Sequence, residues 1–217
     1  MAGPWQPAKA TRRKCRKSVL PLLQAISRLR PASASIAFDS KSGYGQSYQP
    51  GPAFYGDFVE AVRRGRVTGD DELVLRGLVA AQRDGPRKDH YCDLARHWLA
   101  LPELRLPIAP TGGTIWRTPR LDVSIRPDFA VAEANGDVVV VKLWLKEQPL
   151  THDAARGCLR LLTRHMAALS PGGTPVVVDV RREKVHRVGR RPFKRGFDAY
   201  LESEAEAMAA LWQRLAA

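Results

Sequence analysis

Residues 126–146 read RPDFAVAEANGDVVVVKLWLK, and this segment has the pattern of a β-hairpin. Two runs rich in β-branched and apolar residues flank ANG, whose asparagine and glycine favour a tight turn. One charged residue interrupts each run, Asp128 before the turn and Lys142 after it. Because a lysine is rarely buried without a partner or a task, Lys142 is the first candidate for a functional residue.

The length of the turn decides whether these two residues can meet. A two-residue Asn-Gly loop would put Asp128 and Lys142 on opposite faces of the hairpin. A three-residue loop, residues 134–136, with its glycine in the left-handed conformation sets Asp128 directly across from Lys142. We favour the second register, because it gives the strand lysine an ionic partner.

The remaining elements are predicted from apolar spacing and turn residues. Helices are expected over 53–65 with a stop at Gly65, over 71–82, over 89–100, from a cap at Thr151 to about Leu169, and over 197–215. Strands are expected at 115–117, 121–132 and 137–146 in a meander, and at 175–180, where PVVVDV has the continuous apolar run of a buried strand. Alternation of Val180, Lys184, His186 and Val188 predicts that this last strand continues with a basic exposed side.

This order of elements predicts an α/β protein with an α/β/α layered core, because the helix between the last two strands must cross over to a parallel position. The core is expected to span residues 53–217, with a helical part at 53–101 and a sheet-containing part at 111–217. Residues 1–52 are rich in Pro, Ser, Gly, Lys and Arg and lack apolar periodicity, apart from one short amphipathic stretch. They are predicted to form a mobile, basic arm and linker.

The charge of the chain predicts a polyanionic partner. The formal net charge is +13, which favours DNA or RNA. Ten basic residues in two clusters are the predicted nucleic-acid contacts: Arg12, Arg13, Lys14, Arg16 and Lys17 near one end, and Arg187, Arg190, Arg191, Lys194 and Arg195 near the other. A solvated charge run is the simpler interpretation of each cluster taken alone.

No membrane partner is expected. The sequence has no apolar run long enough to span a bilayer and no pattern typical of a secretion signal. Its three cysteines, Cys15, Cys92 and Cys158, are odd in number and far apart, which argues against a disulfide framework. A soluble cytoplasmic protein in a reducing compartment is therefore expected.

With Pro127 and Asp128 before the turn, VVVVK after it, and a helix and strand to follow, residues 54–180 resemble the PD-(D/E)XK nuclease superfamily. The resemblance implies the restriction-endonuclease-like fold, an α/β/α core with a mixed sheet. It also implies hydrolysis of phosphodiester bonds, as in a DNA endonuclease, with Mg²⁺ or Mn²⁺ as cofactor. Metal and ammonium together offset the negative charge that concentrates at the phosphorus.

Carried over to this chain, the resemblance makes Asp128 a metal ligand and Lys142 the catalytic cation. The acid that the family places two residues before the lysine is here Val140, which cannot bind Mg²⁺, so the motif is incomplete. Many relatives complete the metal shell with a glutamate from the helix before the strands. Glu60 is the best candidate for that ligand and catalytic residue, and Asp57, one turn earlier, is an alternative.

Four other hypotheses remain open from the sequence. The chain could be a catalytically degenerate subunit that binds nucleic acid or recruits a larger complex, or a scaffold whose basic arm binds an acidic protein. The pair formed by Asp128 and Lys142 could also be an ordinary cross-strand ion pair, which contributes roughly 0.2–1 kcal/mol. His90, Asp93 and His97 share one face of a predicted helix and form a weaker candidate metal site.

Overall fold

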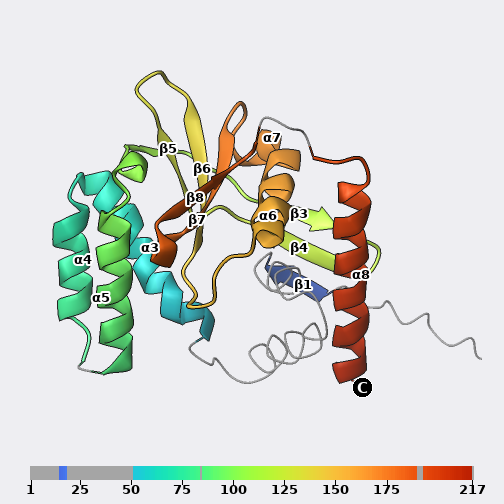
Figure 1. Ribbon diagram of the computed structural model, residues 1–217, viewed down its shortest axis with the longest axis horizontal. Coiled ribbons are helices and arrows are strands. Elements are labelled where there is room, and N and C mark those ends of the chain that lie inside the picture. The colour runs from blue at the N-terminus through green and yellow to red at the C-terminus, as the bar shows by residue number, and fades with distance from the viewer. Residues whose placement is uncertain (1–14, 19–50, 84, 190–192, 217) are drawn as a thin grey trace, which may run out of the picture.

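The computed structural model describes residues 15–18, 51–83, 85–189 and 193–216 (Figure 1). Its helices are α3 (Gly51–Thr68), α4 (Asp71–Ala80), α5 (Pro86–Leu99), α6 (His152–Arg164), α7 (Met166–Leu169) and α8 (Phe197–Ala216), with short 3-10 turns η1 (Pro102–Leu104) and η2 (Val180–Arg182). Asp70 caps α4 and Thr151 caps α6, each by accepting a hydrogen bond from a backbone N–H of the first turn. The predicted cap at Thr151 is confirmed.

The main sheet has five strands in the order β2 (Ile108–Ala109), β5 (Phe129–Ala132), β6 (Val138–Trp144), β7 (Thr174–Asp179) and β8 (Lys184–Arg187). It is mixed, because β6 and β7 pair in parallel while the other neighbours are antiparallel. The parallel pair is joined through α6, as the crossover argument predicted. The α/β class is therefore confirmed.

Helices cover both faces of this sheet, as Figure 1 shows. Along β6, Val139, Val141 and Leu143 are buried against the side formed by α3, α4 and α5. The alternate residues Val140 and Trp144 are buried in a second core together with α6 and α8. Burial on both faces explains why this strand is almost continuously apolar in sequence.

The hairpin has the predicted three-residue loop. Phe129 lies opposite Val141, and the Glu133 N–H donates to the Asp137 carbonyl at 2.8 Å to close the loop. Gly136 has φ of 88°, the left-handed conformation that glycine adopts without strain. This register sets Asp128 across from Lys142, so the predicted pairing of the two arms is confirmed.

One predicted strand, 121–132, is wrong, because the chain divides it between two sheets. β4 (Leu121–Ile125) belongs to a separate three-stranded sheet with β3 (Thr114–Arg117) and β1 (Cys15–Ser18), whereas β5 belongs to the main sheet. The break falls at Pro127, which has no N–H for a ladder and restricts the residue before it. The predicted meander is therefore incomplete, and the short β2 takes the edge position beside β5.

The segment that was predicted as a basic arm contains β1, which pairs in parallel with β4 so that Arg16 lies opposite Asp122 and Lys17 opposite Val123. The predicted contacts Arg12, Arg13 and Lys14 lie outside the described residues, as do the amphipathic stretch and most of the linker. The last two residues of the predicted linker, Gly51 and Pro52, instead begin α3.

Three other boundaries differ from the predictions. The first helix does not stop at Gly65 but continues to Thr68, and Gly69 follows it with φ of 77°. The helix that was expected to reach Leu169 is divided into α6 and α7. The basic continuation of β7 is instead the antiparallel strand β8, because Glu183 adopts φ of 50° and reverses the chain.

Position 65 lies inside α3, at a place where α4 packs closely over it. This close packing accounts for the glycine. A Cβ atom at this position would clash with the Asp71 carboxylate and lie 2.8 Å from the Asp71 Cα. We expect Gly65→Ala to lower the free energy of unfolding by about 1–3 kcal/mol through overpacking. Gly77→Ala is the matched control, since a Cβ there meets nothing within 4 Å, and we expect it to stabilise α4 by up to ~1 kcal/mol. Chemical denaturation measures both, and equal effects would contradict this account.

Candidate functional site

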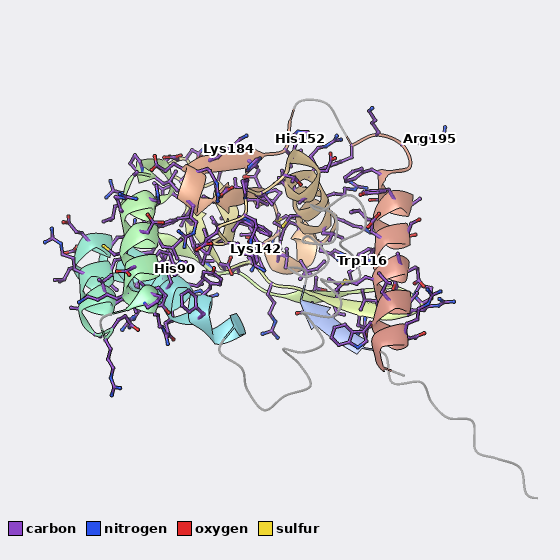
Figure 2. All side chains as sticks on the ribbon, turned by 60° about the horizontal axis from the view of Figure 1, so that its bottom comes forward. His90, Trp116, Lys142, His152, Lys184 and Arg195 are labelled. Carbon is purple, nitrogen blue, oxygen red and sulfur yellow. The ribbon has the colours of Figure 1, made fainter. Side chains whose placement is uncertain are left out.

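A pocket of about 290 Å³ lies between α3 and the end of β6. Helix α3 contributes Tyr55, Gly56, Val59, Glu60 and Arg63, and the hairpin contributes Asp128 and residues 142–146. All three residues that were predicted to be catalytic, Glu60, Asp128 and Lys142, line this pocket. Figure 2 shows Lys142 in the middle of the molecule, between the helical layers.

Asp128 and Lys142 form an almost buried ion pair. The Lys142 Nζ donates to Asp128 Oδ1 at 2.7 Å, and the two side chains are 10% and 15% exposed. The other carboxylate oxygen, Oδ2, accepts from the Leu143 N–H at 2.6 Å. Both oxygens of Asp128 are thus engaged by donors from β6, which fixes the carboxylate at the floor of the pocket.

Arg63 links this floor to Glu60. Its Nε donates to the main-chain carbonyl of Asp128, and its Nη1 lies 3.7 Å from Glu60 Oε2. The Glu60 side chain is 60% exposed, so it stands at the mouth of the pocket rather than at its floor. Asp57, the alternative ligand, is paired with Arg87 and is not among the pocket residues.

Val140 lies where the resemblance requires an acid, and it is completely buried. It pairs with Ala130 on one side and Pro175 on the other, inside the core shared with α6. Within the described part of the chain, no three or more His, Cys, Asp or Glu side chains are grouped to hold a metal ion. Both oxygens of Asp128 already accept hydrogen bonds and Glu60 stands at the mouth of the pocket, so a Mg²⁺ or Mn²⁺ ion at this place would take most of its ligands from water and substrate phosphate.

Arg181, which was not among the predicted site residues, contacts two of the residues that line the pocket, Leu145 and Tyr55. Its Nε donates to the Leu145 carbonyl at 3.1 Å, and its other nitrogens contact Asp93 and His90 on α5. It also forms a hydrogen bond with Tyr55, whose pKa is raised by burial and lowered in part by this guanidinium. This partly buried arginine therefore ties two pocket residues to α5.

The weaker candidate metal site is explained by the same contacts. His90 lies 3.3 Å from Glu147, His97 lies 2.7 Å from Glu183, and Asp93 pairs with Arg181 and Arg96. These three side chains do share one face of α5, but apart from Arg96 their partners come from the segments after β6 and β7. They join α5 to the sheet, and this structural role accounts for their spacing.

Cys158 of α6 is completely buried near the ion pair, and burial raises the pKa of its thiol to about 12. Since the thiolate is the reactive form, we expect Cys158 to resist alkylation by iodoacetamide in the folded protein at mildly alkaline pH. Cys92 is exposed and is the internal control. Peptide mass spectrometry should find Cys92 modified first and Cys158 only after unfolding. Equal rates for the two thiols in the folded protein would be inconsistent with this packing.

Of the basic residues that were predicted to contact nucleic acid, the three whose side chains the structure describes do not line the pocket. Arg187 on β8 and Lys194 and Arg195 before α8 are exposed, while Arg190 and Arg191 lie outside the described residues. Figure 2 shows Lys184 and Arg195 along one edge of the molecule, away from Lys142. These basic residues thus lie along an exposed edge. The pocket, which contains both acidic and basic side chains, is more enclosed and lies apart from that edge.

Comparison with known proteins found no match for this chain. No protein family model matches this sequence, and no curated protein is similar enough to count as a match. None of the described helices is long and apolar enough to cross a membrane. The fold and the pocket therefore define the class, an α/β protein with a mixed five-stranded sheet and a charged pocket where α3 meets β6.

Proposed function

We propose that this chain acts on DNA or RNA and hydrolyses phosphodiester bonds with Mg²⁺ or Mn²⁺. The observation that carries the proposal is the convergence of Glu60, Asp128 and Lys142 on one pocket from a helix and from both arms of the hairpin. Glu60 is far from the other two in sequence, and an ordinary cross-strand ion pair does not require a glutamate from α3 in the same pocket. The mixed sheet, with its parallel β6–β7 pair joined through α6, is compatible with the PD-(D/E)XK nuclease superfamily.

The charges of the pocket suit a phosphate. Arg63, Lys142 and Lys146 contribute three cationic side chains against the carboxylates of Glu60 and Asp128. In this proposal Lys142 contacts the scissile phosphate and offsets the charge that develops on its oxygens. Asp128 and Glu60 would hold the metal ion, which supplies Lewis-acid polarisation of the phosphoryl oxygen when bound.

The surrounding residues orient these groups. Leu143 fixes the Asp128 carboxylate through its N–H, and Arg63 fixes the main chain of Asp128. Arg181 holds Tyr55 and the Leu145 carbonyl at the opposite wall. A displacement of a catalytic group by about 1 Å can lower the rate by roughly 10²-fold. A catalytic site therefore requires neighbouring residues that hold its groups in position.

One observation favours a second candidate function, binding without cleavage. Both oxygens of Asp128 already accept hydrogen bonds, and Val140 offers no oxygen at the position of the missing acid. A metal ion would have to compete with Lys142 for Asp128. In this alternative the chain is a catalytically degenerate subunit that binds nucleic acid within a larger complex, and the Asp128–Lys142 pair only stabilises the hairpin.

Both candidates predict that binding depends steeply on salt, because phosphate contacts release counterions. If six to ten phosphates are contacted, the affinity for duplex DNA should fall by about 10³–10⁵ between roughly 50 and 200 mM salt. Fluorescence anisotropy with labelled duplex and single-stranded oligonucleotides measures this slope. Replacing the basic cluster Arg12, Arg13, Lys14, Arg16 and Lys17 by glutamine, which keeps the backbone of β1 in its sheet, should flatten it. An affinity that does not change with salt would contradict both candidates and favour the scaffold hypothesis.

A further inference from the structure

The small sheet β1–β4–β3 carries a second charged pocket, of about 270 Å³, outside the candidate site. It is lined by Gly113, Thr114, Ile115, Arg117 and Arg126. None of these residues lines the pocket of Lys142.

This pocket lies on the outer face of the small sheet. The inner face packs against α8 through the buried side chains of Trp116, Val123 and Ile125. Arg117 and Arg126 are exposed on the other face. In Figure 1, α8 lies next to β3 and β4, which agrees with this division of the sheet.

Gly113 provides the space in which Arg126 lies. A Cβ atom at position 113 would be 3.0 Å from Arg126 Cγ and 3.6 Å from its Nε. Because position 113 has no side chain, the aliphatic part of Arg126 can lie beside it and the guanidinium can line the pocket. A side chain at position 113 would require Arg126 to shift, and a β-branched one would require the larger shift.

Within the part of the chain that the structure describes, the two arginines are not committed to carboxylates. Across the described residues, neither Arg117 nor Arg126 forms an ion pair, although Asp122 lies opposite Arg117 on β4. One buried oxygen of Asp122 also has no hydrogen-bond donor within the same residues. Two guanidinium groups, a threonine hydroxyl and the main chain at a glycine are donors of the kind that bind phosphate oxygens, often in bidentate fashion.

We propose that this outer face is a second phosphate-binding site for the backbone of a nucleic acid, with Arg117 and Arg126 as its contacts. Arg126 precedes Asp128 by two residues, so their main-chain positions are at most about 7 Å apart. In this proposal, a strand whose phosphate lies at Lys142 continues onto Arg126 and then along β3 to Arg117. The inference rests on the proposed function, since it extends the path of the same nucleic acid.

Two variants test this site by different means. Arg117→Gln/Arg126→Gln removes both guanidinium groups, and we expect the slope of log affinity against log salt for duplex DNA to become shallower by about 2 units. Gly113→Val keeps the net charge but displaces Arg126, and it should reduce the slope by about 1 unit. Anisotropy with the full chain measures both, and circular dichroism checks that the fold is retained.

The control is Arg76→Gln/Arg83→Gln, which removes the same charge from exposed positions on α4 and the turn after it. Figure 1 shows α4 on the side of the molecule opposite β3. We expect this control to keep the wild-type slope. A slope reduced equally in the control and in Arg117→Gln/Arg126→Gln would overturn the site, because it would reflect net charge alone.

The possible failures are distinguishable. If wild-type protein binds nucleic acid and both test variants keep its slope, the second site is wrong and the proposed function stands. If wild-type protein binds no nucleic acid at any salt concentration, the proposed function fails together with this site. If it binds only vesicles that contain phosphatidylserine, and Arg117→Gln/Arg126→Gln abolishes that binding, the face recognises lipid headgroups and the proposal is overturned.

Discussion

Asp71→Ala is expected to lower the free energy of unfolding by about 3–5 kcal/mol, because it leaves a buried guanidinium without a partner. Arg66 on α3 donates through its Nε to Asp71 Oδ1 at 2.7 Å, and Trp98 on α5 donates to Asp71 Oδ2 at 2.9 Å. The side chains of Arg66 and Asp71 are only 6% and 1% exposed. This carboxylate is therefore the point at which α3, α4 and α5 are joined.

Asp70 is a neighbouring control of the same chemical type. It is exposed and caps α4 by accepting from the Leu73 N–H at 2.9 Å. Asp70→Ala should cost about 1 kcal/mol, the usual value for a lost cap. Denaturation by urea, followed by tryptophan fluorescence, compares the two variants. A loss at Asp71 no larger than the loss at Asp70 would show that the buried network does not hold the helices together.

Lys142→Met is expected to reduce the cleavage rate by about 10²–10³-fold, the range seen when one preorganised donor to a developing charge is removed. The methionine keeps most of the volume of the stem, while Asp128 keeps its hydrogen bond from the Leu143 N–H. Nucleic-acid binding should change little, since the exposed basic residues remain. The measurement is a single-turnover rate together with an affinity.

Lys184→Met is the control, because Lys184 is exposed on β8 and lies apart from Lys142 in Figure 2. It removes the same charge and should leave the rate within a few-fold of the wild type. If both lysine variants lose activity equally, the loss reflects the removal of a positive charge and not the position of Lys142. If wild-type protein cleaves and Lys142→Met cleaves at the same rate, Lys142 is not the catalytic cation.

The parts of the fold that the sequence predicted are those set by local rules. Loop length and a left-handed Gly136 determine the hairpin register, and that register alone brings Asp128 to Lys142. The parallel pairing of β6 and β7 follows from the helix between them. Glu60 was predicted by resemblance and lies in the same pocket, although its side chain is at the mouth rather than beside Asp128.

The parts that were not predicted depend on contacts between distant segments. An apolar alternating run from 121 to 132 gives no sign that its halves join different sheets, except for Pro127, which the prediction treated only as part of a motif. Arg181 belongs to a basic run and its role follows only from its partners on α5. Arg63, three residues after Glu60, could have been found by helical spacing, because i and i+3 positions are neighbours.

The most direct test of the central claim is Mn²⁺-dependent cleavage of labelled DNA and RNA by the wild type, Glu60→Gln and Asp128→Asn. Gln and Asn preserve shape but weaken the carboxylate donors that would hold the ion. The account predicts that the wild type cleaves with Mn²⁺, that chelation by EDTA stops it, and that each variant loses the activity while retaining salt-sensitive binding. Cleavage by the wild type that both variants retain in full would place the chemistry elsewhere and contradict the assignment of this pocket. Salt-sensitive binding with no cleavage by the wild type would also contradict it, in favour of a subunit that binds without cutting.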